Sequence, residues 1–183
     1  MELDLGPPCP EALLLSLDGK RDAVVTRWLG RTLQDYAEDT SRFLLREKDR
    51  FHNPVGHALK EGLPALFDAL LLGDASGDLE SKLDAIIRMR AVQDFSATQA
   101  VSFVFLVKEI VRQQVKDGRD ASPGGRALAA FESRVDRLAL HAFNLFVQCR
   151  EQISAIKARS AGRRTFVSER LAADPRGGGR FRG

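Results

Sequence analysis

The feature that most constrains the fold is a long stretch near the C-terminus without proline or glycine. It runs from Arg126 to about Ala161, roughly 35 residues, which would form an α-helix about 50 Å long at about 1.5 Å per residue. A compact domain of this size has a radius of gyration of only about 15 Å. We therefore predict a long final helix whose C-terminal end extends beyond what its own domain covers.

This stretch also has an apolar residue at every seventh position. A seven-residue repeat held this long favours a coiled-coil-like contact. Periodicity does not name the partner, so the stripe can pack into its own domain or against another chain. Because it continues to Ile153 and Ile156, we predict a homodimer, with Leu145, Cys149, Ile153 and Ile156 as the candidate seam. The repeat consists of Leu128, Val135, Ala142, Cys149 and Ile156, with Phe131, Leu138, Leu145 and then Gln152.

The rest of the chain has helical periodicity and no sustained apolar–polar alternation. Asn53-Pro54 is a strong helix start, and Ser96 with Gln99 forms a capping-box pattern. Pro64 is expected to kink or split the helix that contains it. The sequence therefore predicts an all-α bundle of about six to seven helices. We expect helices at about 20–36, 40–51, 54–72, 79–93, 97–116 and 126–161, after a short apolar turn at 13–17.

Composition divides the chain into a leader at 1–19, a helical domain at 20–161 and a tail at 162–183, which we expect to be disordered because of its glycine and arginine content. Residues 159–183 carry seven arginines and two acidic residues, a net charge of +5, whereas the whole chain carries +3. Residues 1–158 therefore sum to −2. A mildly acidic body does not indicate a specific nucleic-acid partner.

The cysteines and the apolar runs indicate the cellular compartment of the protein. Cys9 and Cys149 are too far apart in sequence to suggest a disulfide framework or a zinc site. The acidic start and the short run at 12–15 do not form a signal peptide. The longest apolar run, 103–107, falls far short of the roughly 20 residues of a membrane span. We expect a cytoplasmic protein with no membrane span.

Residues for catalysis or metal binding do not form a recognisable pattern. The three histidines are His52, His57 and His141. His52 and His57 are separated by five positions across a helix start, which is not a ligand spacing. The sequence contains no nucleophile elbow, P-loop or dinucleotide fingerprint. We therefore expect no enzyme activity, no cofactor and no metal.

The most apolar helix, at about 97–116, contains the charged pair Lys108-Glu109. A buried charge must find a partner or reach water. Arg88 and Arg90 on the preceding helix are plausible partners for Glu109, so we predict a buried ion pair that locks the two helices. The alternative interpretation is a ligand-sensing site.

Several segments resemble one known family. The match spans about residues 20–160, and its most specific part is RAVQDFS at 90–96. Together the segments are similar to the N-terminal domain of the RsbRD-type RsbT co-antagonist proteins. They are FLLREKDRF at 43–51, NPVG at 53–56, IIRMRAVQDFS at 86–96, QAV at 99–101, FVFLVK at 103–108 and RVDRLA at 134–139.

The resemblance implies a globin-like helical sensory domain without haem, usually dimeric, that feeds a signal to a C-terminal STAS domain. That STAS domain acts in a partner-switching stress pathway with a serine/threonine kinase. Nothing after residue 160 resembles a STAS domain, so we expect a signalling module that acts in trans on an unknown protein partner. The alternatives are a ligand-binding or haem-binding sensor globin and an accessory subunit of a cytoplasmic enzyme complex. Because the stretch 79–95 has no histidine to serve as an axial ligand, we predict no bound haem.

Overall fold

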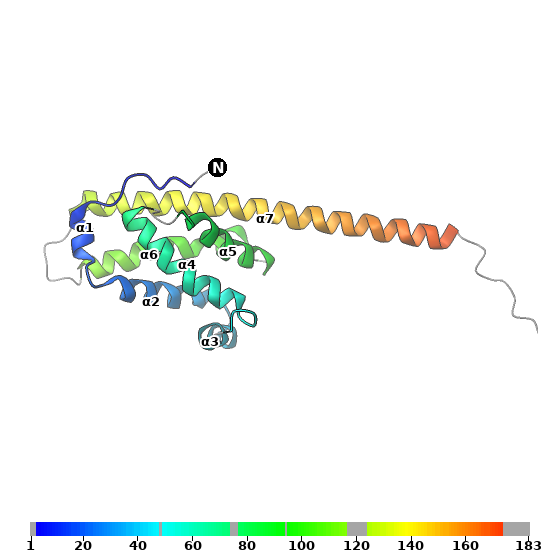
Figure 1. Ribbon diagram of the computed structural model, residues 1–183, viewed down its shortest axis with the longest axis horizontal. Helices are drawn as coiled ribbons and strands as arrows, with labels where there is room; N and C mark the ends of the chain where they lie inside the picture. Colours follow the sequence, from blue (N-terminus) through cyan, green and yellow to red (C-terminus); the bar gives the residue numbers. More distant parts are fainter. Residues whose placement is uncertain (1–2, 48, 74–76, 94, 117–123, 174–183) are drawn as a thin grey trace, which may run out of the picture. The chain divides into compact units, whose positions relative to one another are not determined.

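The computed structural model describes residues 3–47, 49–73, 77–93, 95–116 and 124–173, with side chains up to residue 160. This described part contains seven α-helices, one short 3-10 helix and no β-strand (Figure 1). The predicted all-α class with a long C-terminal helix is therefore confirmed. The helices are α1 Glu11–Ser16, α2 Arg21–Thr32, η1 Leu33–Asp35, α3 Glu38–Arg46, α4 Pro54–Leu72, α5 Leu79–Val92, α6 Ala97–Lys116 and α7 Gly125–Ala173.

The chain consists of two compact units, residues 1–147 and 148–183. In the first unit, α4 packs along α5 and against α2, which in turn packs against α6. The α4–α5 contact is close at Gly62, where a Cβ would lie 2.7 Å from Cδ1 of Ile86. Trp28 is fully buried, and its indole N–H donates to the Phe103 carbonyl at 2.7 Å. The core therefore lies between α2, α4 and α6, with α5 and the first part of α7 around it (Figure 1).

Helix starts follow the predicted capping signals. The Asn53 side chain accepts from the Gly56 amide at 2.8 Å and caps α4. Ser96 and Gln99 make the reciprocal bonds of a capping box at the start of α6, at 3.0 and 3.2 Å. Of the kink or split predicted at Pro64, the split does not occur, since α4 is one helix from Pro54 to Leu72. Proline removes one amide donor, and burial of apolar side chains on both sides of it outweighs that loss.

The leader contains α1, and its residues 3–10 form no helix or strand but belong to the folded body. Leu5 and Cys9 are buried, and the Cys9 amide donates to the Leu71 carbonyl at 2.8 Å. The buried Arg134 of α7 ties the leader to the C-terminal end of α4. Its guanidinium donates to the carbonyl oxygens of Leu5, Gly6, Pro7, Ala69 and Leu70.

The second unit contains the C-terminal part of α7. The sequence places the end of this helix near Ala161 and the tail from 162, whereas α7 continues to Ala173. A single glycine in a helix costs only about 1 kcal/mol, and the arginine, leucine and alanine that follow Gly162 are good helix formers. The rest of the predicted tail, 174–183, lies outside the described residues.

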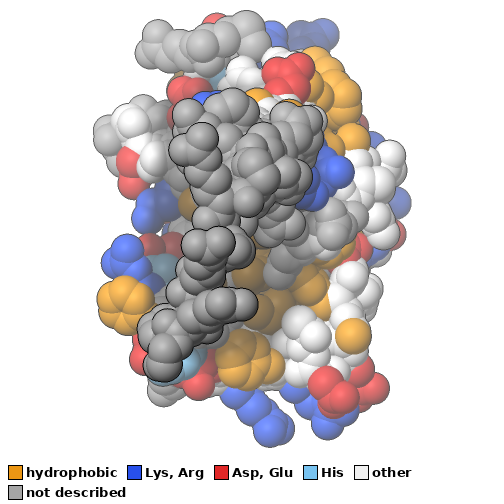
Figure 2. Space-filling model, turned by 90° about the vertical axis from the view of Figure 1, so that its right-hand side faces the viewer, with side chains coloured by type: hydrophobic (Ala, Val, Ile, Leu, Met, Phe, Trp, Pro, Cys, Tyr) orange, Lys and Arg blue, Asp and Glu red, His pale blue; other side chains and the backbone are white. Residues whose placement is uncertain are grey.

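The surface shows both signs of charge. On the face drawn in Figure 2, basic and acidic side chains of the described residues are interspersed. None of the helices, over the residues described, combines the length and apolar character needed to cross a membrane.

Candidate functional site

The segment with the most specific family resemblance builds a cage around the Arg90 side chain, which is only 1% exposed. Both terminal guanidinium nitrogens lie 3.0 Å from Oδ2 of Asp35 in η1. One of them also donates to the Gln99 carbonyl at 2.7 Å. Three aromatic rings face the guanidinium at 5.0 to 5.5 Å from their centroids, those of Tyr36, Phe95 and Phe103.

This Arg90 cage joins η1, α5 and α6. A buried guanidinium is costly to desolvate, and here one carboxylate, the carbonyls and the ring faces offset that cost. Burial also raises the pKa of the Tyr36 hydroxyl, against the opposing effect of Arg90. The cage is therefore a structural clamp that fixes α5 against its neighbours.

The predicted buried ion pair is wrong, because Glu109 pairs with neither Arg88 nor Arg90. Glu109 lies on the exposed edge of α6, where its carboxylate is 2.5 Å from Arg31 of α2. The Arg31 guanidinium holds the pKa of that carboxyl below its ordinary value. Arg90 points to η1 instead, and Arg88 donates to Asp84 one turn earlier in α5. Helical spacing gave the right residue types but not which neighbouring helix each side chain faces.

An apolar groove lies between α6 and α7 in the first unit. It has a volume of about 340 Å³. Leu140 is 68% exposed, and Phe105 and Phe143 are about half exposed. At its edge Lys108 pairs with Asp136 at 2.6 Å, and its ammonium lies 5.6 Å from the centre of the Phe105 ring. An apolar floor with a charged edge is typical of a protein contact surface. The lining residues are Ala97, Thr98, Val101, Ser102, Phe105, Ala139, Leu140 and Phe143.

The four residues of the predicted dimer seam fall into two groups. Leu145 and Cys149 are buried in the single chain. Ile153 is partly exposed, and Ile156 is 59% exposed. The seven-residue stripe is therefore used inside the chain as far as Cys149, and of these four residues Ile153 and Ile156 are the ones accessible to a second chain.

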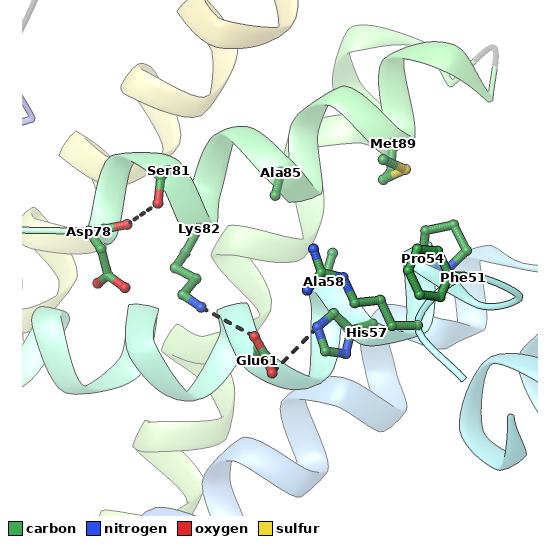
Figure 3. A pocket seen from close by; sticks show the side chains of 11 residues that line it. Phe51, Pro54, His57, Ala58, Glu61, Asp78, Ser81, Lys82, Ala85 and Met89 are labelled. Atoms are coloured by element: carbon green, nitrogen blue, oxygen red, sulfur yellow. Dashed lines mark hydrogen bonds and ion pairs between the residues drawn. The ribbon is translucent and has the colours of Figure 1, made fainter. Parts of the chain in front are cut away.

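A second groove, of about 640 Å³, runs along the surface of α4 and α5 (Figure 3). Glu61 of α4 lies at its centre, with its carboxylate 3.3 Å from the Lys82 ammonium and 3.4 Å from Nε2 of His57. Among the residues that line this groove, the sequence suggested a possible ligand role only for His57, and its spacing from His52 did not support that role. The spacing of His57 and Glu61 on one face of α4 could have indicated this groove from the sequence. The position of Lys82 opposite them could not be predicted from the sequence. The groove is lined by Arg50, Phe51, Pro54, His57, Ala58, Glu61, Asp78, Ser81, Lys82, Ala85 and Met89.

The other histidines and the cysteines occupy separate places. His52 lies 2.9 Å from Asp49, and the buried His141 has Nε2 3.4 Å from Glu80. Cys9 and Cys149 are both buried, and neither forms a disulfide. Over the residues that the structure describes, no group of three or more histidine, cysteine, aspartate or glutamate side chains is arranged to hold a metal ion.

These features describe an all-α domain whose surface carries an apolar groove and a charged groove. The sequence profile of the RsbT co-antagonist protein rsbRD N-terminal domain matches residues 22–161. The chain therefore belongs to this family, which confirms the resemblance seen in the sequence. The matched range begins in α2 and ends in α7, so it includes the Arg90 cage and both grooves. Comparison with curated proteins and with solved structures gave no match.

Proposed function

We propose that the protein is a non-enzymatic, cytoplasmic signalling module that regulates a partner protein by direct contact. The observation that carries this proposal is the family match over residues 22–161, since the family is defined on a domain of a co-antagonist protein. The exposed apolar groove between α6 and α7 supports it, because contiguous apolar surface on a folded domain commonly marks a protein interface. The cytoplasmic location rests on the composition of the chain.

The first partner of this module is a second copy of the same chain. The α6–α7 groove is suited to self-association because it combines a hollow lined by small side chains, such as Ala97 and Ala139, with protruding Phe143 and Leu140. Across a two-fold axis the protruding side chains of each copy can enter the hollow of the other. The Lys108–Asp136 pair at the edge is internally neutral, so it does not repel a second copy.

The C-terminal part of α7 supplies a second contact in the same dimer. Ile153 and Ile156 continue the seven-residue stripe in the second unit, where Ile156 is largely exposed. Pairing of the same strip from two chains removes its apolar surface from water on both. A shift between the paired helices would then be a signal that a partner protein can read.

The oligomeric state tests this part of the proposal. Light scattering of the purified chain at tens of micromolar should give the mass of a dimer. The variants Leu140→Glu/Phe143→Glu and Ile153→Glu/Ile156→Glu should each shift the protein toward monomer, because they place charge in the proposed contact. Phe51→Glu is the matched control, since Phe51 is an exposed apolar residue outside both contacts. A monomeric wild type, or dimers that persist in both double variants, would refute the dimer.

Affinity purification from native cells tests the regulatory role. The tagged chain should capture a signalling protein such as a kinase or a STAS-domain protein. Less of this protein should be captured by a variant with a changed apolar groove, such as Leu140→Glu/Phe143→Glu. Stoichiometric recovery of a catalytic subunit would instead establish an accessory subunit of an enzyme complex. A bound chromophore in the purified protein would establish a sensor globin.

A further inference from the structure

Arg50 stands out in the α4–α5 groove because its charge has no carboxylate partner. Within the described part of the chain it takes part in no ion pair, whereas Arg21, Arg31 and Arg42 each pair with an acidic side chain. It lines the groove from the segment just before α4. A guanidinium presents several N–H donors in one plane, which suits it to bind a carboxylate or phosphate with two parallel hydrogen bonds. Arg50 therefore gives the groove an anion-binding group.

Apolar side chains line the groove as well. Phe51 is 89% exposed, and no other large apolar side chain in the described ranges is more exposed. Figure 3 shows Phe51 beside Pro54, with Met89 of α5 near them. An exposed aromatic ring next to a thioether and a proline forms a surface that loses unfavourable contact with water when an apolar body covers it. The lining of the groove thus includes both a cationic group and apolar side chains.

The carboxylate of Glu61 is balanced by Lys82 and His57, and these contacts leave N–H donors of Lys82 available. Glu61 is shared between Lys82 and His57, but both distances, 3.3 and 3.4 Å, are longer than a normal charge-assisted hydrogen bond. A lysine ammonium has three N–H donors. Lys82 can therefore contact a ligand while it keeps Glu61. Asp78 lies at the opposite end of the groove from Phe51 (Figure 3).

We propose that the α4–α5 groove binds a small amphipathic carboxylate, with its anionic head on Arg50 and its apolar body against Phe51 and Met89. The volume of about 640 Å³ falls within the usual range of small-molecule sites. The groove is open along one side, so we expect weak binding, with a Kd on the order of 0.1–1 mM. The site goes beyond the regulatory role proposed above and does not depend on it, because binding is measured on the purified chain alone.

Titration of the ¹⁵N-labelled full chain with 4-phenylbutyrate tests the site. Saturable amide shifts are expected at residues 50–58 and 81–89, which line the groove from both sides. Two matched probes separate the parts of the ligand: 4-phenylbutanol has the same body without the charge, and acetate has the charge without the body. Each should bind at least about tenfold more weakly than 4-phenylbutyrate. Absence of saturation by about 10 mM, or shifts mainly elsewhere, would overturn the proposal.

Two variants should change the affinity in opposite directions, which a general loss of structure would not produce, and a third is the control. Arg50→Gln should weaken binding of 4-phenylbutyrate about tenfold, because it removes the charged donor. Glu61→Gln should strengthen it about threefold, because it removes the only acidic group at the centre of the groove, among the residues described, and releases Lys82. Arg42→Gln, at an exposed arginine outside the groove, is the control and should leave the Kd unchanged.

Each result decides the proposal. Unchanged binding in Arg50→Gln would show that the head of the ligand does not contact that guanidinium, and weaker binding in Glu61→Gln would show that the ligand does not respond to charge in the groove. Either outcome would refute the proposed binding site. Failure here would leave the oligomerisation and capture experiments unaffected, since those use other surfaces of the protein.

Discussion

Replacement of Asp35 by asparagine tests how much the negative charge of Asp35 in the Arg90 cage contributes to the stability of the protein. The change keeps the size of the side chain but removes the negative charge that lies 3.0 Å from both terminal nitrogens of Arg90. Two unit charges about 4 Å apart interact by about 4 kcal/mol at an effective dielectric constant of about 20. The Asp35 side chain is 31% exposed, so solvent screening reduces this to about 2–3 kcal/mol. We expect Asp35→Asn to lower the free energy of unfolding by that amount.

A double-mutant cycle with Arg90→Met separates this charge effect from packing. Methionine fills part of the cage without a charge, so no cation is left that needs Asp35. In the Arg90→Met background, Asp35→Asn should therefore change the free energy of unfolding by only a few tenths of a kcal/mol, giving a coupling energy of about 2–3 kcal/mol. The control cycle uses Arg88→Met and Asp84→Asn, a more exposed pair one helical turn apart, and should give about 0.5 kcal/mol or less.

Urea unfolding followed by tryptophan fluorescence measures the cycle. Trp28 is the only tryptophan, and its indole is bonded to the carbonyl of Phe103, whose ring faces Arg90. The probe therefore reports on the core next to the cage. Asp35→Asn should also lower the melting temperature by roughly 4–12 °C, at about 2–4 °C per kcal/mol. A coupling energy below about 0.5 kcal/mol would refute the view that Asp35 compensates a buried charge.

Three further predictions concern the haem question, the tail and the leader. The purified protein should show no Soret band; a band that is lost on mutation of any one histidine would contradict this. Truncation after Gly162 should leave the melting temperature nearly unchanged, because the composition of the removed segment buries little, and a drop of about ten degrees or more would show that it docks on the body. Burial raises the pKa of the Cys9 thiol above its ordinary value of 9.0, against the opposing effect of Arg134. The stability that the neutral thiol contributes is therefore complete below about pH 9 and lost as the pH rises through the higher folded value, so the free energy of unfolding should fall more steeply above about pH 9 than in Cys9→Ala; equal slopes would contradict it.

Local signals in the sequence predicted the helices well because the interactions that start and stop a helix involve neighbours within about four positions. Asn53 caps α4, and Ser96 with Gln99 caps α6, as their spacing indicated. The predictions were less accurate where a local signal had to be weighed against the rest of the molecule. Of the kink or split predicted at Pro64, the split of α4 does not occur, and Gly162 does not end α7. Neither residue is strong enough alone to end a helix whose flanking residues favour it.

The candidate sites show the limit of sequence reasoning more clearly. The charged residues at 88, 90 and 109 were recognised, but their partners were not, because Arg31 and Asp35 lie more than fifty positions away in the chain. The α4–α5 groove was missed for the same reason, since Glu61 and Lys82 meet only when the two helices lie side by side. The seven-residue stripe of α7 was found, but its repeat does not distinguish burial in the chain from contact with a copy.

The sequence by itself determined that this protein is all-helical, where most of its helices begin, and to which family it belongs. These properties follow from periodicity, capping and short motifs, which are written in residues close together along the chain. Only the tertiary structure decided that the leader is held by Arg134, that Arg90 is caged, and that the apolar stripe is buried from Phe131 to Cys149. Those properties depend on which helix faces meet. The packing of the whole chain selects those contacts, and no local pattern specifies them.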